Sequence, residues 1–214
     1  MGTRRIVFEN AIYHIMTRGN NRQEIFCDAM DRAEYLHVFY QAKQMFSLKV
    51  YAYALMPNHV HLLLETPLAN ISAAMKFLNW TYVTRFNYRH MRSGHLFENR
   101  YKSKLVQKDR YLMSALKYIH NNPVKAGLCD KPEDYRWSSH KAFLSAQVGL
   151  AVVGSTLAFF DRDPVRAAAM YREFFKLPLP DSEWALFDKS RSGIIGDKEF
   201  RARCRSVKKL QPVQ

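Results

Sequence analysis

MPNHVHLLLE, residues 56–65, joins a Pro-Asn turn signal to a short apolar run. A short apolar run that follows a turn predicts a buried strand, here starting at His59. Alternate residues of a strand point to the same face, so His59 and His61 project side by side, roughly 7 Å apart along the backbone. Two neutral imidazoles at this spacing can bind one divalent cation. From this motif alone, the alternative is that one histidine is a structural core residue and the other is present by chance.

Composition indicates a folded protein with a polyanionic partner. The chain has 214 residues, enough for one medium domain with a substantial core, and 48% of them are hydrophobic. The formal net charge of +14 favours nucleic acid as the partner, with a merely basic soluble protein as the alternative. Cys27, Cys129 and Cys204 are far apart, which argues against a cysteine-rich zinc motif and favours reduced thiols in the cytoplasm. The sequence shows neither a signal peptide nor an apolar stretch long enough to span a bilayer.

Hydrophobic periodicity predicts the other elements of the first two thirds of the chain. Strands are expected at 11–17, 48–56, 59–65 and 100–107, and helices at 28–46, 67–88 and 109–121. The last of these helices is expected to end before Pro123, because the residue before a proline disfavours helix. The first six elements form a β-α-β-β-α-β unit, which predicts an α+β protein with a ferredoxin-like four-stranded antiparallel sheet. The next helix is an addition that must pack near the sheet or its edge.

The remainder of the chain gives a weaker pattern. A shift in composition at 146–155, with two glycines, predicts a linker. Helices are expected at 163–176 and 197–210, the first with Pro164 in its first turn. We therefore expect a first domain at 1–145 and a mostly helical, basic extension at 146–214.

The segment LKYIHNNPVKAGL, residues 116–128, places Tyr118 and Asn122 on one helical face. A His-hydrophobic-His strand followed by a helix with Tyr-Ile-His-x-Asn-Pro-Val-x-Ala-Gly resembles the HUH single-tyrosine transposases, and most closely the REP-associated tyrosine transposases. Supporting segments are YHIMTRGNNRQEIF at 13–26, ALMPNHVHLLLE at 54–65, HLFENRYKSKLV at 95–106 and GDKEF at 196–200. The resemblance covers residues 6–145 well and makes the first domain the catalytic one.

This resemblance implies metal-dependent cleavage and rejoining of single-stranded DNA at REP-type hairpins. His59, His61 and Asn122 would hold Mg²⁺ or Mn²⁺, which would polarise the scissile phosphate. Tyr118 would attack phosphorus, form a 5′-phosphotyrosine and release a 3′-hydroxyl.

Each of these residues has an alternative role. Tyr111 lies seven residues before Tyr118, on roughly the same helical face, and is the rival nucleophile. Asn122 can instead cap the end of its helix. His14, on the first strand, can border the site, although a lone strand histidine is more often structural. We expect His120 to lie outside the site, as a supporting or surface residue.

The segment 85–104 contains six cationic residues and one acidic residue, Glu98. Tyr88, Phe97 and Tyr101 lie between the cations in the sequence. Cations with interleaved aromatic residues are typical of single-strand-binding surfaces, and a solvated helix end is the alternative. The predicted DNA contacts are Arg4, Arg18, Arg22, Arg85, Arg89, Arg92, Arg100, Lys102 and Lys104. The first three are candidates for reading the tetranucleotide at the foot of the hairpin.

Two other functions share part of this pattern. A domesticated protein could bind the hairpins with little transposition, but the complete set of predicted catalytic residues argues against it. A replication-initiating or conjugative nuclease would share the two histidines, but the segment 118–127 and the lack of a helicase motif argue against that. We expect a cytoplasmic bacterial protein that acts on DNA as a monomer, with a dimer as the alternative, and needs neither a membrane nor a nucleotide cofactor.

Overall fold

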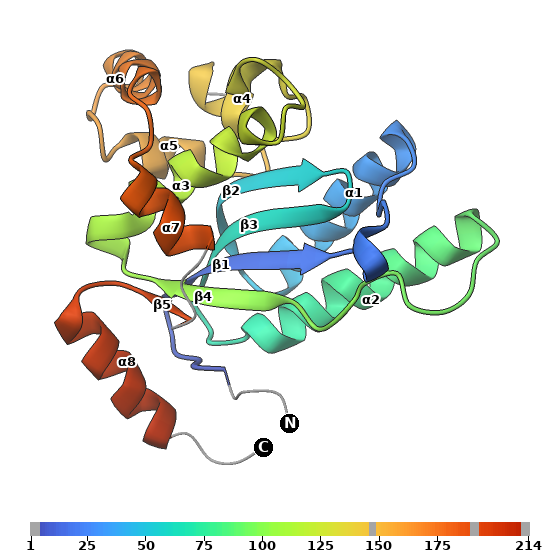
Figure 1. The fold of residues 1–214 in the computed structure, drawn as a ribbon. Helices are drawn as coiled ribbons and strands as arrows, with labels where there is room; N and C mark the ends of the chain where they lie inside the picture. Colours follow the sequence, from blue (N-terminus) through green and yellow to red (C-terminus); the bar gives the residue numbers. More distant parts are fainter. Residues whose placement is uncertain (1–4, 146–148, 189–192, 211–214) are drawn as a thin grey trace.

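The computed structural model describes residues 5–145, 149–188 and 193–210, apart from the side chains of 208–210. Figure 1 shows a central sheet with helices around it. The strands are β1 (Ala11–Arg18), β2 (Lys49–Met56), β3 (His59–Thr66), β4 (Lys102–Val106) and β5 (Ile194–Ile195). The helices are α1 (Ala29–Met45), α2 (Ile71–Arg89), α3 (Lys108–Lys125), α4 (His140–Leu144), α5 (Val153–Leu157), α6 (Pro164–Lys176), α7 (Asp181–Asp188) and α8 (Lys198–Leu210), with 3-10 turns at Asn20–Arg22 and Pro132–Asp134.

The sheet has the order β2-β3-β1-β4-β5. The predicted α+β class is confirmed, and the β-α-β-β-α-β unit is present, with antiparallel pairing of β1 with β3, β1 with β4 and β2 with β3. The four predicted strands pair antiparallel as expected, but the sheet has a fifth strand, because β5 pairs parallel with β4 and makes the sheet mixed. A strand of two residues is too short to produce a periodic signal in the sequence.

Strand alternation separates two hydrophobic cores, one on each face of the sheet. On one face Tyr13 and Ile15 pack with residues of α1 and α2. On the other face Ile12 and Leu63 pack with α3 and with helices of the extension. His61 lies two residues before Leu63 on β3, so the two side chains are on the same face of the sheet. His61 therefore points towards α3 and the extension.

The third helix extends further than its sequence predicts. It was expected to end before Pro123, but α3 continues to Lys125 with the proline inside it. The proline removes one backbone donor near the end of the helix, and the last turn still closes through Ala126 N to Asn122 O and Leu128 N to Pro123 O, both at 2.9 Å. One lost backbone bond is therefore tolerated, because neighbouring donors complete the turn.

The extension packs against the first 145 residues. Helix α6 begins as predicted, with Asp163 accepting a hydrogen bond from Arg166 N, whereas α5 starts inside the predicted linker and α7 was not predicted. Residues 146–148 of that linker lie outside the described part of the chain. The division into two domains at residue 145 stays a prediction. Within the described residues, no helix is long and apolar enough to cross a membrane.

Candidate active site

A cavity of about 430 Å³ opens on the α3 face of the sheet. Its lining residues are His14, Met16, Arg18, His59, His61, Lys102, Lys104, Tyr118, Asn122, Phe187 and Asp188. The structure thus brings together all four residues that were predicted to carry the chemistry and three of the predicted DNA contacts. Their roles stay predictions, but their convergence from β1, β3, β4 and α3 is a property of the fold.

The two histidines of β3 lie side by side, with ring centroids 4.9 Å apart. Asn58 Nδ2 donates to Arg22 O, so Asn58 Oδ1 accepts a hydrogen bond from His59 Nδ1 at 2.6 Å. This contact fixes the tautomer of His59 and leaves Nε2 available as a ligand atom. Burial, with help from the Arg18 charge, lowers the pKa of His59 to about 4, so the imidazole is neutral near pH 7.

His14 belongs to the same cluster. Its Nε2 lies 2.9 Å from His61 Nδ1, so one of these two atoms donates a hydrogen bond to the other. If His61 binds a metal through Nε2, its Nδ1 carries the proton and donates to His14, an arrangement that orients the ligand. Burial lowers the pKa of His14 to about 3 and that of His61 well below its usual range. The sequence places His14 on a strand, but only the pairing of β1 with β3 shows which histidine it meets.

Tyr118 is covered by the extension. Its side chain is 3% exposed and stacks on Phe187 of α7, with ring centroids 4.8 Å apart. Its hydroxyl donates a hydrogen bond of 2.6 Å to Asp188 Oδ1. Burial, and then the hydrogen bond to this carboxylate, raise the pKa of the phenol well above its usual value. The hydroxyl is therefore held in its neutral form next to the histidine cluster.

Asp188 was not foreseen from the sequence, because α7 is short and lacks a predictive pattern. Its Oδ2 accepts a hydrogen bond from Lys125 Nζ at 2.8 Å. Burial raises the pKa of Asp188, but the hydrogen bonds from Lys125 and Tyr118 outweigh burial and hold the pKa below its usual value. Lys104 Nζ donates to the backbone oxygens of Leu186 and Phe187, so a cation of the cavity also anchors α7.

Asn122 lies one turn after Tyr118 and donates from Nδ2 to Tyr118 O at 2.7 Å. The side chain thus bonds its own helix and offers Oδ1 as its remaining ligand atom. Neutral imidazole nitrogens and an amide oxygen fit a divalent metal. We conclude that His59, His61 and Asn122 suit the predicted Mg²⁺ or Mn²⁺, with His14 as support.

Tyr111, the rival nucleophile, lies outside the cavity lining. It is partly buried against the core on the α3 face. Two helical turns separate it from Tyr118, about 10 Å along the axis. The fold therefore favours Tyr118 on position alone.

His120 was expected to be a supporting or surface residue, and the surface alternative is wrong. Its side chain is fully buried on α3. Nδ1 lies 2.9 Å from Tyr171 Oη and Nε2 lies 2.7 Å from Ser139 Oγ. His140 Nδ1 lies 2.8 Å from the same tyrosine oxygen. This network joins α3, α4 and α6, which explains why a histidine in the tyrosine motif does not enter the cavity.

The other predicted DNA contacts lie outside this cavity. Arg85 forms an ion pair with Glu34 and Arg89 forms one with Asp28, so both link α2 to the first turns of α1. Arg92 Nη2 donates to Gln23 Oε1 at 2.9 Å. The remaining three differ in their positions. Arg22 is exposed, Arg100 lines a second cavity, and Arg4 lies outside the described residues.

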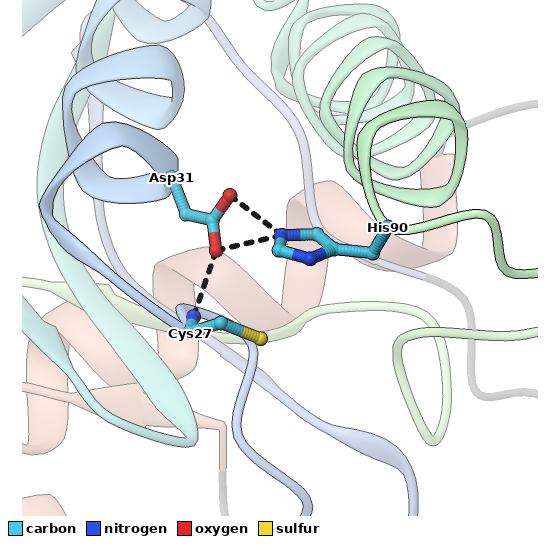
Figure 2. Close-up of side chains that lie close together, drawn as sticks. All are labelled: Cys27, Asp31 and His90. Atoms are coloured by element: carbon cyan, nitrogen blue, oxygen red, sulfur yellow. Dashed lines mark hydrogen bonds and ion pairs between the residues drawn. The ribbon is translucent and has the colours of Figure 1, made fainter.

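A second cluster of potential metal ligands, Cys27, Asp31 and His90, lies between α1 and α2 (Figure 2). Asp31 accepts from Cys27 N at 2.7 Å and contacts His90 Nε2 at 2.9 Å. It also pairs with the Arg89 guanidinium, which already supplies positive charge there. Burial and neighbouring acids raise the pKa of the Cys27 thiol, which favours its neutral form. We interpret this cluster as a structural contact that holds α1 and α2 together through ion pairs, not as the catalytic metal centre.

Comparisons with known proteins identify a family and a fold for this chain. A family model described as "Transposase IS200 like" matches residues 7–122, more than half of the chain. A Haemophilus influenzae protein named as a REP-associated tyrosine transposase is 23% identical over 126 residues, which cover 54% of this chain and 72% of that protein. A solved structure of a REP-associated tyrosine transposase bound to a REP hairpin superimposes on this chain with a TM-score of 0.60 and 15% identity. The match covers 70% of this chain and 89% of that one, so the two share a fold. With a family match over the histidine strand and the tyrosine helix, this chain belongs to the IS200-like transposases.

Proposed function

We propose that this protein is a metal-dependent single-stranded DNA transposase that cleaves and rejoins DNA at REP-type hairpins. The observation that carries the proposal is the convergence of Tyr118, His59, His61 and Asn122 on one basic cavity. Transposases of this family generally use a divalent metal. The REP hairpin comes from the curated and structural relatives, whose names identify REP-associated proteins. The net charge of +14 supports a nucleic-acid substrate.

In this mechanism Tyr118 Oη attacks the scissile phosphorus. A bond forms between the phenolic oxygen and phosphorus, and the bond from phosphorus to the 3′ oxygen breaks. The leaving 3′ oxygen takes up a proton from solvent and the phenolic proton passes to solvent, so the products are a 5′-phosphotyrosine and a 3′-hydroxyl. Because the covalent link keeps the phosphodiester energy, the reverse attack by a 3′-hydroxyl rejoins a strand without ATP.

The remaining cavity residues position the substrate. Arg18, Lys102 and Lys104 line one cavity with Tyr118, where they can bind the phosphates on either side of the cleavage site. His59, His61 and Asn122 would hold the metal, which supplies polarisation of the scissile phosphate and stabilises its developing charge.

Formation of a covalent adduct tests this proposal. The protein is incubated with a labelled single-stranded hairpin DNA and Mn²⁺, and the products are separated on a denaturing gel. We expect a protein-linked DNA band that requires both Mn²⁺ and an unpaired cleavage site. Hairpin binding without any adduct under these conditions would contradict the proposed activity.

One observation favours a second candidate, a hairpin-binding protein with little transposition. Tyr118 is covered by α7, and its hydroxyl is engaged by Asp188. Tight binding with adduct formed only after α7 is disturbed would support this candidate. We further propose that the protein acts as a cytoplasmic monomer on bacterial DNA.

A further inference from the structure

A second cavity, of about 750 Å³, lies on the other side of β4 from the tyrosine. One wall is α2, which contributes residues three and four positions apart from Ser72 to Val83. The opposite wall is the segment 95–101, which leads directly into β4. The volume falls in the range of cavities that hold small ligands.

The chemistry of this cavity combines an aromatic face, buried polar groups and cations. Trp80 lines it and is 69% exposed, which is unusual for a large aromatic side chain. Among the described residues nothing hydrogen-bonds the buried Oδ1 of Asn79, which also lines it. The Arg5 guanidinium lies 3.8 Å from the centroid of the Tyr101 ring. Lys76 and Arg100 add two exposed cations.

The lining favours an anionic ligand with an aromatic part. Glu98 is the one acid among the lining residues that the structure describes, and its carboxylate lies 3.9 Å from Lys102 Nζ. Lys102 lines the active-site cavity, and Arg100 lines the second one. Arg100 and Lys102 are two residues apart, so the cations of the two cavities follow one another along the chain. A single DNA strand leaving the tyrosine can therefore stay on a basic surface as far as the second cavity.

We propose that this cavity binds an unpaired base of the DNA substrate, stacked on Trp80, while Lys76 and Arg100 bind its flanking phosphates. This inference rests on the proposed function, because the ligand is the same single strand. Stacking on an exposed aromatic ring and a cation beside the backbone are the usual means of holding unpaired bases.

Binding measured in EDTA tests the cavity independently of the chemistry. The probes are a blunt hairpin, the same hairpin with a single-stranded extension, and a series of extensions with one abasic site each. The variants are Trp80→Ala and Trp80→Phe. Tyr40→Ala, on α1, is the matched control, because Tyr40 is 50% exposed and outside the cavity lining.

We expect Trp80→Ala to weaken binding of the extended hairpin by about 5- to 150-fold, corresponding to about 1–3 kcal/mol for one stacked base. Trp80→Phe should restore most of the affinity, and Tyr40→Ala should bind as the wild type does. One abasic position should weaken the wild type by a similar factor and leave Trp80→Ala unaffected, and the blunt hairpin should not distinguish the variants.

Equal affinities of the wild type and Trp80→Ala for the extended hairpin would overturn the cavity assignment alone. A loss in Trp80→Ala that is the same for blunt and extended hairpins would also overturn it. Absence of hairpin binding by the wild type would overturn the proposed function, and this inference with it. Binding without a covalent adduct in Mn²⁺ would contradict the activity and leave the base site standing.

Discussion

Replacing Asp188 with asparagine should accelerate formation of the covalent adduct. The substitution keeps the size of the side chain and removes its negative charge. Asp188 now accepts a hydrogen bond of 2.6 Å from the Tyr118 hydroxyl. After burial, this hydrogen bond is the next largest cause that raises the pKa of the phenol. It also places a negative charge where the substrate phosphate must approach. With reacting atoms about 3–3.5 Å apart, the phosphate would lie about 5 Å from this carboxylate.

The magnitude follows from Coulomb's law in a partly hydrated cavity. The Asp188 side chain is 40% exposed, so we take an effective dielectric constant of about 40–80. At about 5 Å, the repulsion between two unit charges is then about 0.8–1.7 kcal/mol. Each 1.4 kcal/mol corresponds to about a tenfold change in rate. The expected acceleration is therefore about 4- to 17-fold, measured as the initial rate of adduct formation on a denaturing gel with subsaturating DNA.

Asp181→Asn provides the control, because it removes the same charge from the exposed beginning of the same helix. It should leave the rate unchanged within about twofold. A slower reaction in Asp188→Asn would refute the reasoning and identify the carboxylate as the acceptor of the phenol proton. Equal acceleration in both variants would show that the effect is a general change in charge and not a local contact.

Three further predictions concern the metal, the DNA and the buried histidines. Alanine at His59 or His61 should abolish Mn²⁺-dependent adduct formation while the thermal unfolding midpoint stays near that of the wild type, and full activity in both variants would remove the metal assignment. If DNA binding neutralises about six phosphates, the affinity should fall about a thousandfold between 50 and 200 mM salt. An affinity that does not change in a salt titration would show that the basic surface does not bind the DNA. Burial lowers the pKa of His140 to about 4, so between about pH 6.5 and pH 4 the unfolded chain binds a proton that the folded chain does not. The free energy of unfolding, measured by urea titration, should therefore decrease with falling pH in this window. His140→Gln should reduce the slope of this free energy against pH by about 1.4 kcal/mol per pH unit. An unchanged slope would contradict the assignment.

Local patterns in the sequence predicted the strands and helices between residues 11 and 125 and the side chains that share a face. The alternation of β3 placed His59 and His61 on one face, and helical spacing placed Tyr118 beside Asn122. These predictions depend on residues that are close in the sequence, where geometry is set by the type of element.

The rest of the cavity depends on contacts between distant segments. His14 meets His61 only through the register of β1 with β3, and Asp188 reaches Tyr118 from 70 residues away. Helix α7 and β5 are too short to give a periodic signal, so their packing on α3 and β4 could not be foreseen. The prediction that Pro123 ends its helix failed because a proline near a helix end costs only one backbone bond.

The nucleophile assignment is tested most directly by comparing Tyr118→Phe with Tyr111→Phe. Each substitution removes one hydroxyl from α3 and keeps the aromatic ring, so packing and DNA affinity should change little. Labelled single-stranded hairpin DNA is incubated with each variant in Mn²⁺ and analysed on a denaturing gel. We expect the protein-linked band to disappear in Tyr118→Phe and to remain in Tyr111→Phe. A band that persists in Tyr118→Phe would contradict the central claim, because the covalent bond would then form on another residue.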